Sequence, residues 1–454
     1  MRPGWADALA DALGGCPVET DVDILAAHAR DQAPLAPAGV AAALVRARTV
    51  AQVQAALRFA NERGIPVVTR AAGTGLAGGA NAVDGCLLLG VRGLDRILSL
   101  DPASRLAVVE PGVLNGDLDR AAMAHGLRYA PDPSSRDIST IGGNIATNAG
   151  GACCLKYGVT GDHVAALVVA LADGSLVQTG GRTRKNVAGL DLTRLMVGSE
   201  GTLGVIVQAT VRLIPAPRPA STALAFFPTL AAAGACVVAL AARGDLSLLE
   251  LMDQVTVRAV ESLARLGLDT DAAACLVLQC DAVDAPSGVA AAVALCEAHG
   301  ARDVLATDDP EEGRQLLGAR RLSLPALEKL GTTLLDDVAV PLGALPEMLR
   351  RIAAAAAREG VVVGTFGHAG DGNLHPTLVF DATDPAQTRA ASLAFDAIVR
   401  DAVDLGGTIT GEHGVGSLKV PYLGTMLGEG ERALMRRIKA AFDPNGILNP
   451  GRGY

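Results

Sequence analysis

Aromatic residues are scarce in this 454-residue sequence, since Phe, Trp and Tyr together make up only 3% of it. Half of the residues are still hydrophobic, and much of this apolar content is alanine. The chain therefore has ample material for buried cores. Chains longer than about 250 to 300 residues usually divide into several domains, because a single core stops growing at that size. We expect a globular protein of two or three domains.

Basic runs and long hydrophobic runs are also missing. The net charge is −9, and affinity for nucleic acid depends on clustered positive charge, so a nucleic-acid-binding role is disfavoured. No apolar run reaches the roughly 18 residues that read as a membrane-spanning helix. The first residues, MRPGWADALADALGG, carry acidic side chains where a signal peptide would have an apolar core. We expect a cytoplasmic protein and leave peripheral contact with a membrane open.

The eight cysteines are scattered and form no C-x-x-C pair. Iron–sulfur clusters and cysteine zinc sites usually need such spacings, so neither is expected. Reduced thiols fit a cytoplasmic protein.

Helix and strand signals mix along the first half of the chain. Helical spacing of apolar residues predicts a helix over 49–63 that Gly64 ends. Short apolar runs predict strands within 65–70, 86–91, 105–112, 163–171, 175–179 and 204–214. The glycine-rich segment 131–158 is predicted to be irregular, and three prolines in IPAPRPAS (214–221) predict a linker. Beyond it, alanine-rich helices such as 230–242, 288–299 and 345–358 alternate with strands, which predicts a separate α+β domain before a final helix near 432–442.

The stretch AAGTGLAGGA places Gly73, Gly75 and Gly78 at the spacing G-x-G-x-x-G. A Rossmann site also needs a helix directly after these glycines. Residues 79–85, GANAVDG, instead lead through a turn into the strand CLLLGV, so the Rossmann interpretation fails. Glycines let successive backbone N–H groups approach anionic oxygens, which favours a phosphate cradle, with a plain turn left open as the alternative.

A second glycine cluster, TIGGNIATNAGG, occupies residues 140–151. Thr140, Asn144 and Asn148 add hydroxyl and amide groups to its backbone donors. Such a set suits a long polar cofactor better than a simple turn.

The ordered series RAAGTGLAGGA, PDPSSRDISTIGGNIATNAGG, KYGVTGDHV and GSEGTLGVI resembles the FAD-binding domain of the vanillyl-alcohol oxidase / p-cresol methylhydroxylase (PCMH) type. The most similar branch contains D-lactate dehydrogenases, D-2-hydroxyglutarate dehydrogenases and the large subunit of glycolate oxidase. The resemblance runs from about residue 36 to 454. It implies an α+β fold with a two-part PCMH-type FAD-binding domain at 36–217. An α+β substrate (cap) domain with an antiparallel sheet follows at 218–454, and its C-terminal tail returns to the flavin.

The same resemblance implies which residues bind FAD. Some relatives tether FAD through a histidine in the first glycine loop, but residues 70–80 contain none, so non-covalent FAD is expected. The implied cofactor-binding residues are Ala72, Gly73, Thr74, Gly75, Leu76, Gly78, Gly79, Pro131, Thr140, Ile141, Gly143, Asn144, Asn148, Gly150, Gly151, Glu200, Gly204, Ile206 and Asn449.

Three of the seven histidines lie in two short polar motifs, GHAGDGNLH and GEHGVG. The strand VVVGTFGH would end at His368, and His375 would begin the return strand, so antiparallel pairing could place the two imidazoles side by side. With the carboxylate of Glu412 they would form a common ligand set for zinc or manganese. The spacing H-x6-H is no standard metal signature, and hydrogen-bonded structural histidines remain the alternative.

The resemblance implies that His368, His375 and Glu412 bind a divalent metal and that His413 is the catalytic base. It also implies that Arg320 grips the substrate carboxylate, although the adjacent Arg321 leaves the register open. Relatives that act on dicarboxylates carry a lysine shortly before the strand DDVAVP. Residues 332–335, TTLL, hold none here, which favours a monocarboxylate.

We therefore expect an FAD- and divalent-metal-dependent dehydrogenase that oxidises a D-2-hydroxy acid, favouring a D-lactate-like monocarboxylate, to the 2-oxo acid. A D-2-hydroxyglutarate dehydrogenase and a glycolate oxidase subunit are the alternatives within the family. The alternatives outside the family are a metal-dependent hydrolase or lyase and a non-catalytic FAD-binding subunit. Without a cysteine cluster the electrons are expected to leave to an external acceptor, such as a quinone, a cytochrome, an electron-transfer flavoprotein or an iron–sulfur subunit, with direct use of oxygen left open. A homodimer is the assembly considered.

Overall fold

Residues 4–453 are described by the computed structural model and divide into two units. The first contains the residues up to Gly150, then Gly158–Ala216, and the chain from Glu412 onwards; the second contains Gly151–Tyr157 and Pro217–Gly411. The boundary between Ala216 and Pro217 lies inside the predicted linker. The predicted domains were 36–217 and 218–454. In the structure the first unit also includes the residues before 36 and the chain from Glu412 onwards. The second unit also includes the seven residues Gly151–Tyr157.

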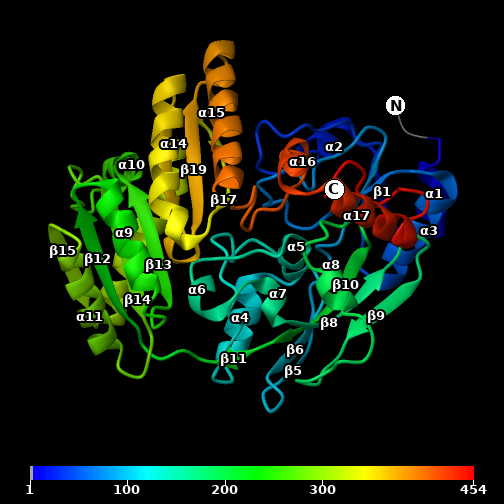
Figure 1. The fold of residues 1–454 in the computed structure, drawn as a ribbon. Helices are drawn as coiled ribbons and strands as arrows, with labels where there is room; N and C mark the ends of the chain where they lie inside the picture. The colour runs from blue at the N-terminus through cyan, green and yellow to red at the C-terminus, as the bar shows by residue number, and fades with distance from the viewer. Residues whose placement is uncertain (1–3, 454) are drawn as a thin grey trace. The chain divides into compact units, whose positions relative to one another are not determined.

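A small, mostly parallel sheet carries the first glycine loop. Its strand order is β1 (Val18–Glu19), β2 (Ala43–Arg46), β4 (Leu87–Gly90) and β3 (Val67–Arg70), and the pairs β2–β4 and β4–β3 are parallel (Figure 1). Helix α3 (Val50–Arg63) connects β2 to β3. The Gln52 N–H donates to Thr49 Oγ1 at its start, and Gly64, with φ of 63°, ends it. The predicted helix and its stop are confirmed.

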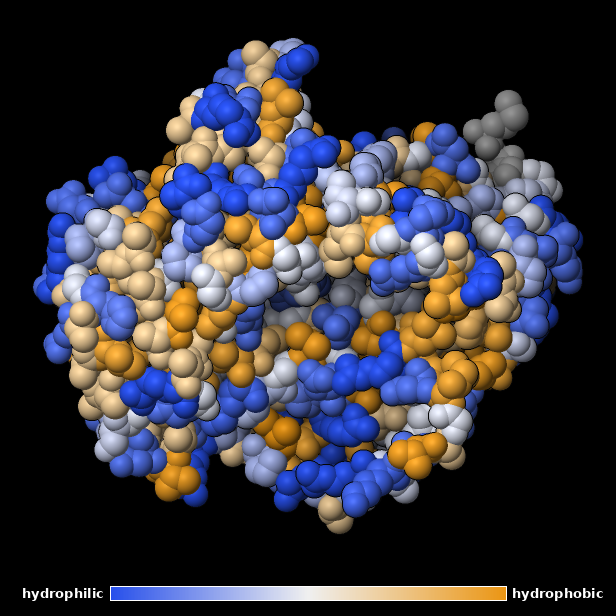
Figure 2. All heavy atoms as spheres, viewed as in Figure 1, coloured by the Kyte–Doolittle hydropathy of each residue, from blue (hydrophilic) through white to orange (hydrophobic). Residues whose placement is uncertain are grey.

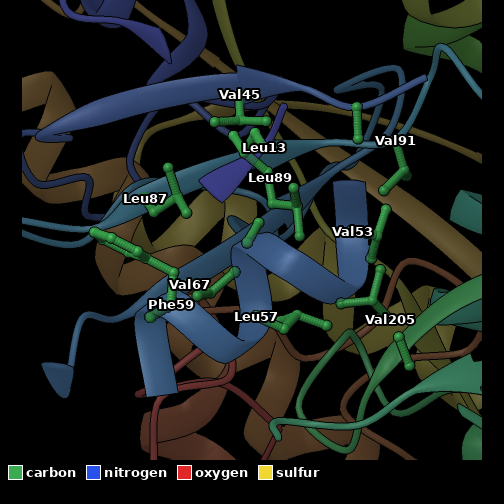
Figure 3. Close-up of a cluster of buried hydrophobic side chains, with 14 of the residues drawn as sticks. Leu13, Val45, Val53, Leu57, Phe59, Val67, Leu87, Leu89, Val91 and Val205 are labelled. Carbon is green, nitrogen blue, oxygen red and sulfur yellow. The ribbon is translucent and has the colours of Figure 1, made fainter. Parts of the chain in front are cut away.

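Aliphatic side chains of helix α3 fill the core beneath this sheet (Figure 3). Val53 and Leu57 from the helix pack with Leu87 and Leu89 from β4, and all four are buried. Each such burial stabilises the fold by about 1.5 to 3 kcal/mol. The core continues to Val205 at the start of β10, so it joins this sheet to the next one.

The second sheet of the first unit is antiparallel. Its order is β5 (Ile97–Asp101), β6 (Leu106–Val109), β10 (Val205–Arg212), β8 (Val164–Ala170) and β9 (Leu176–Gly180). Two short strands, β7 (Leu127–Arg128) and β11 (Ile214–Pro215), pair with each other in a separate two-stranded antiparallel sheet. The helices of this unit are α1 (Ala6–Ala12), α2 (Val22–His28), α4 (Asn115–Met123), α5 (Ile141–Thr147), α7 (Thr160–His163), α8 (Leu192–Met196), α16 (Leu423–Met426) and α17 (Glu429–Phe442).

Helix α5 corrects the prediction that 131–158 is irregular, and a further short helix, α6 (Cys154–Tyr157), follows in the second unit. The Gly143 N–H donates to Thr140 Oγ1, which caps α5. A Cβ on Gly142 would lie 2.4 Å from the Pro111 Cβ, so this helix needs glycine for close packing. Glycine's poor helix propensity hid the helix in the sequence.

The C-terminal tail returns to the parallel sheet. The Val67 N–H donates to the Ile447 carbonyl at 2.8 Å, and the Asn449 N–H donates to the Val67 carbonyl at 2.8 Å. Leu448 thus pairs in parallel with β3, the strand that leads into the glycine loop. The α+β fold and the return of the tail to the first unit agree with the prediction.

One antiparallel sheet forms the centre of the second unit. Its order is β15 (Asp303–Thr307), β12 (Ser221–Phe227), β14 (Ala274–Cys280), β13 (Leu248–Asp253), β18 (Val362–Gly367), β19 (Asn373–Phe380) and β16 (Thr332–Leu335), with β17 (Val338–Ala339) paired to β19. The main helices are α9 (Leu230–Ala241), α10 (Gln254–Ala264), α11 (Ala285–Ala298), α12 (Pro310–Arg321), α13 (Ser323–Glu328), α14 (Leu345–Glu359) and α15 (Pro385–Asp404). The predicted antiparallel sheet is confirmed.

Helices α14 and α15 lie side by side (Figure 1) and are joined by charged side chains. Arg351 on α14 pairs with Asp401 and Asp404 on α15 at 2.9 and 2.7 Å. Figure 2 shows hydrophilic and hydrophobic side chains mixed over the visible surface of this helix pair. Over the range 4–453, no helix has both the length and the apolar character needed to cross a membrane.

Candidate active site

Two histidines stand next to each other where strands β18 and β19 meet. His368 directly follows β18, and His375 pairs with Phe366 across the two strands. Their ring centroids are 5.1 Å apart and the rings are nearly perpendicular. The predicted side-by-side placement is therefore confirmed. A short 3-10 turn, η2 (Ala369–Asp371), makes the connection, and Gly372 after it has φ of 73°, a conformation that favours glycine.

A buried carboxylate that the sequence analysis did not identify holds His368. Glu250 lies on β13, the strand next to β18, and its Oε1 is 2.6 Å from His368 Nδ1. Burial alone would raise the pKa of Glu250, but the nearby charges of His368 and Arg320 outweigh it and lower that pKa below its usual value. In metal-binding histidines one ring nitrogen commonly contacts a carboxylate in this way while the other faces the metal. The signal in the sequence was a carboxylate flanked on both sides by apolar residues in LLELM.

The same carboxylate pairs with Arg320, in the last turn of α12. Arg320 Nε lies 2.6 Å from Glu250 Oε2, and this contact is an ion pair without the alignment of a hydrogen bond. The guanidinium carbon lies 4.6 Å from the centre of the Phe366 ring. Arg321 is exposed. Arg320 is thus the arginine of this pair that shares the Glu250 carboxylate with His368.

Asp337 is a second buried carboxylate at this place. It accepts hydrogen bonds from Asn373 Nδ2 at 2.7 Å, from Thr410 Oγ1 at 2.7 Å and from the Gly411 N–H at 2.8 Å. His375 Nδ1 is 3.6 Å from Asp337 Oδ1. Asp337 was not among the predicted site residues, although it belongs to the strand-like segment DDVAVP. Its contacts fix the backbone up to Gly411, the residue before Glu412.

Glu412 and His413 open the C-terminal part of the first unit, directly after Gly411 in the chain. His413 Nε2 and Glu412 Oε1 are 3.9 Å apart. Gly414 follows with φ of 87°, a conformation that favours glycine and turns the chain directly after these two residues.

The first glycine loop turns its carbonyl groups into the protein. The Gly75 carbonyl accepts from the Gln32 N–H, and the Ala77 carbonyl accepts from the N–H groups of Ser417 and Leu418. The Gly79 carbonyl accepts from Asn449 Nδ2. By contrast, the N–H groups of residues 73–77 make no hydrogen bond within the described part of the chain. A loop with satisfied carbonyls and available N–H groups is a cradle for an anion.

Two arginines bring positive charge to this cradle. Arg452 donates from Nε to the Gly78 carbonyl at 2.9 Å and from Nη2 to the Asn81 carbonyl at 3.0 Å. Arg70 folds over the loop, because a Cβ on Gly73 would lie 2.3 Å from Arg70 Nη2. No helix follows the glycines before β4 begins at Leu87. The absence of the Rossmann helix is confirmed, and the cradle fits a phosphate group without it.

The second glycine cluster supplies polar groups near the N-terminal end of α5. Asn144 is buried, and its Nδ2 has no hydrogen-bond partner within residues 4–453. A buried donor without a partner is costly, so it suits a bound polar group. Asn148 adopts φ of 55° at the end of α5, and its Oδ1 accepts from the Gly161 N–H at 2.8 Å.

The remaining predicted cofactor residues lie at defined places in the first unit, except Gly151, which opens the short segment of the second. Gly204 precedes β10, where a Cβ would lie 2.4 Å from Val169 Cγ1. Pro131, Ile141 and Gly150 are buried, and Ile206 is partly buried on β10. Ala72, Thr74, Leu76 and Gly78 belong to the cradle, and Thr140 and Gly143 to the cap of α5.

The Glu200 side chain, predicted to lie at the cofactor, binds two backbone N–H groups of the loop after His413. Its Oε1 accepts from the Val415 N–H at 2.5 Å, and its Oε2 accepts from the Gly416 N–H at 2.8 Å. Burial raises the pKa of Glu200 to about 7, although the two N–H groups oppose this shift. The carboxylate therefore faces the loop that contains His413.

The cradle gives a test with a matched pair of glycines. A Cβ on Gly78 would lie 2.3 Å from Ser417 Oγ and 2.6 Å from the Ala36 Cβ, whereas a Cβ on Gly85 would meet nothing within 4 Å. Both glycines have φ near 75°, so both substitutions carry the same backbone strain. We expect Gly78→Ala to displace the loop and to raise the Kd for FAD by about tenfold or more. A loss of about 1.4 kcal/mol of binding free energy is enough for a tenfold change. Gly85→Ala should leave it near the wild-type value, as measured by quenching of flavin fluorescence on titration. Equal Kd values for the two variants would contradict the cradle.

The sequence and the fold are similar to those of known proteins. The family model "FAD binding domain" matches residues 41–180, and "FAD linked oxidases, C-terminal domain" matches residues 216–452. Glycolate oxidase subunit GlcD from Bacillus subtilis (strain 168) is 42% identical over 416 residues, which cover 91% of this chain and 88% of that protein. D-lactate dehydrogenase from Archaeoglobus fulgidus is 38% identical over 88% of each chain. The structure of p-cresol methylhydroxylase with substrate bound is similar in fold, with a TM-score of 0.82 at 18% identity, and the match covers 98% of this chain and 95% of that one.

Proposed function

Because the chain belongs to the FAD-linked oxidases, we propose that it is an FAD- and divalent-metal-dependent dehydrogenase that oxidises a D-2-hydroxy acid to the 2-oxo acid. The observation that carries this proposal is the adjacent pair His368 and His375, with the buried Glu250 carboxylate in contact with both His368 and Arg320. The names of the relatives, a glycolate oxidase subunit and D-lactate dehydrogenases, support a 2-hydroxy acid as the substrate class.

The cradle and the second glycine cluster are proposed to hold FAD without a covalent bond. The available N–H groups of residues 73–77 would receive the pyrophosphate, and the unpartnered Nδ2 of Asn144 would meet a polar group of the cofactor. His368, His375 and Glu412 are proposed to hold the metal, and two nitrogens with one carboxylate oxygen suit zinc or manganese. When bound, FAD supplies a hydride acceptor and the metal a Lewis acid that makes the substrate hydroxyl more acidic.

The chain's own residues would then bind and orient the substrate. Arg320 offers the terminal nitrogens of its guanidinium to the substrate carboxylate, since its Nε is already paired with Glu250. Glu250 and Phe366 keep the guanidinium in place, which reduces the entropy lost on binding. His413 would accept the hydroxyl proton on an imidazole nitrogen.

A short monocarboxylate is the preferred substrate. Strand β16 (Thr332–Leu335) contains no charged side chain at the place where dicarboxylate-specific relatives have a lysine. Leu334 and Leu335 are buried, and Thr332 and Thr333 are neutral. A second substrate carboxylate would find no cation on this strand, so D-lactate is favoured over D-2-hydroxyglutarate.

The electrons are proposed to leave to an external acceptor. All eight cysteines are free thiols, and they include no C-x-x-C pair. The chain therefore has no cysteine cluster with which to hold an iron–sulfur relay. A quinone, a cytochrome, an electron-transfer flavoprotein or an iron–sulfur subunit would complete the turnover.

A panel of substrates tests the proposal. Dye reduction by the purified protein is followed with D-lactate, L-lactate, glycolate and D-2-hydroxyglutarate, each before and after treatment with a chelator. We expect the highest kcat/KM with D-lactate, loss of activity on chelation, and its return with zinc or manganese. Activity that ignores the chelator would contradict the metal role, and a colourless protein without a flavin band would favour a hydrolase or lyase. Highest kcat/KM with D-2-hydroxyglutarate would overturn the monocarboxylate preference.

A further inference from the structure

We propose that Glu200 is the residue that positions the base loop, residues 412–416, for catalysis. This inference rests on the proposed role of His413, which lies two residues before the first backbone N–H that Glu200 binds. It assigns to the Glu200 side chain a task other than contact with the cofactor. Glu200 would act through the loop without touching the substrate, so it is a positioning residue.

The carboxylate of Glu200 meets the loop with both of its oxygens. Oε1 accepts from the Val415 N–H at 2.5 Å and Oε2 from the Gly416 N–H at 2.8 Å. Each oxygen of the carboxylate accepts one of the two adjacent N–H groups. The loop is thereby tied to one side chain at two successive residues.

Glu200 is itself held firmly from two sides. Its N–H donates to the Ala146 carbonyl, near the end of α5, at 2.8 Å. Its carbonyl accepts from Asn449 Nδ2, in the C-terminal tail, at 2.6 Å. Glu200 has φ of 51°, an unusual value for a residue with a side chain. A strained backbone that its surroundings hold in place is typical of functional positions.

The loop approaches Glu200 as closely as glycine allows. A Cβ on Gly414 would lie 2.2 Å from Glu200 Oε1, and a Cβ on Gly416 would lie 1.9 Å from the Ala77 carbonyl. Both glycines have positive φ, 87° and 51°. At Gly414 and Gly416 the base loop is therefore packed against Glu200 and the phosphate cradle with no room for a side chain. A catalytic group on such a loop depends on this contact for its position.

Glu200→Gln is the direct test, with Glu110→Gln as a matched control. Glutamine keeps one oxygen acceptor but turns an NH2 group towards the second N–H, so one of the two bonds is replaced by a repulsive contact. Glu110 is also a buried glutamate of the first unit, but it pairs with Arg96 instead of the base loop. We expect Glu200→Gln to lower kcat for D-lactate by about 10²-fold, since a displacement of about 1 Å can cost that much. KM and FAD content should stay near the wild-type values, and Glu110→Gln should change none of these.

Chemical labelling gives a readout that does not need turnover. The rate at which diethylpyrocarbonate modifies His413, followed by mass spectrometry of the intact holoenzyme's peptides, should rise in Glu200→Gln, because the loop is no longer held. Gly414→Ala places a methyl group against Glu200 Oε1 and so disturbs the same contact from the loop. This variant should also raise the labelling rate.

Three outcomes are decisive. Wild-type kcat and labelling rates in both Glu200→Gln and Gly414→Ala would overturn the proposal. Loss of FAD from Glu200→Gln with unchanged kcat per bound flavin would also overturn it, because Glu200 would then serve the cofactor. If the wild type oxidises no 2-hydroxy acid but the labelling rate still rises in both variants, the positioning role stands and the proposed function fails.

Discussion

Replacing His413 with alanine is expected to lower kcat for D-lactate by about 10²- to 10⁴-fold, the usual contribution of a general base. The physical reason is that no other group in the motif GEHGVG can accept the hydroxyl proton once Glu412 is committed to the metal. The flavin should stay bound, because the cradle residues do not include His413. Steady-state dye reduction and the visible flavin spectrum of the purified variant measure the two effects separately.

A matched control for this change is His299→Ala. His299 ends helix α11 in the second unit, and its Nδ1 lies 2.8 Å from the Leu295 carbonyl, so its ring has a local structural contact. We expect near-normal turnover from this variant. Added imidazole should partly restore His413→Ala, because a free base can enter the space that the ring leaves. Near-normal turnover of His413→Ala would refute the assignment of the base.

Replacing His375 with alanine is expected to remove the divalent metal and, with it, nearly all activity. Ring centroids of His368 and His375 are 5.1 Å apart, so the loss of one imidazole takes away one of two adjacent nitrogen ligands. The metal content of the dialysed protein, measured by elemental mass spectrometry, should fall to background. FAD content should not change.

Glu250→Gln is expected to weaken metal binding less than His375→Ala does. Glutamine can still accept from His368 Nδ1 but carries no charge, and residues that support a ligand in this way typically contribute about 10- to 100-fold to metal affinity. We expect weakened but measurable metal binding and a raised KM, because Arg320 also loses its ion pair. A His375→Ala protein that retains stoichiometric metal and activity would show that the histidine pair is structural.

Features that depend on short stretches of sequence could be predicted. Thr49 and Gly64 bound helix α3 as their residue types indicate, and the seven-residue separation of His368 and His375 matches an antiparallel connection. The turn after Gly79 correctly excluded a Rossmann helix. Helix α5 was missed because its glycines have low helix propensity and serve close packing against Pro111.

Features that depend on sheet order could not be predicted. Glu250 reaches His368 because β13 lies next to β18, although the two residues are 118 positions apart. Asp337 meets Gly411 across 74 positions. Likewise, the sequence does not show which of Arg320 and Arg321 lies on the buried face of α12. In the structure Arg320 packs on Phe366 and Arg321 is exposed. No local pattern specifies these pairings, so they emerge only from the assembled sheet.

The central claim, metal-dependent oxidation of a D-2-hydroxy acid by bound FAD, is tested most directly by a single anaerobic turnover. Purified protein is stripped with a chelator, one half is reloaded with zinc or manganese, and both are mixed with D-lactate without any electron acceptor. The reloaded protein should lose its visible flavin band and form one pyruvate per flavin, while the stripped protein keeps its band. Bleaching at the same rate in both samples, or in neither, would contradict the account.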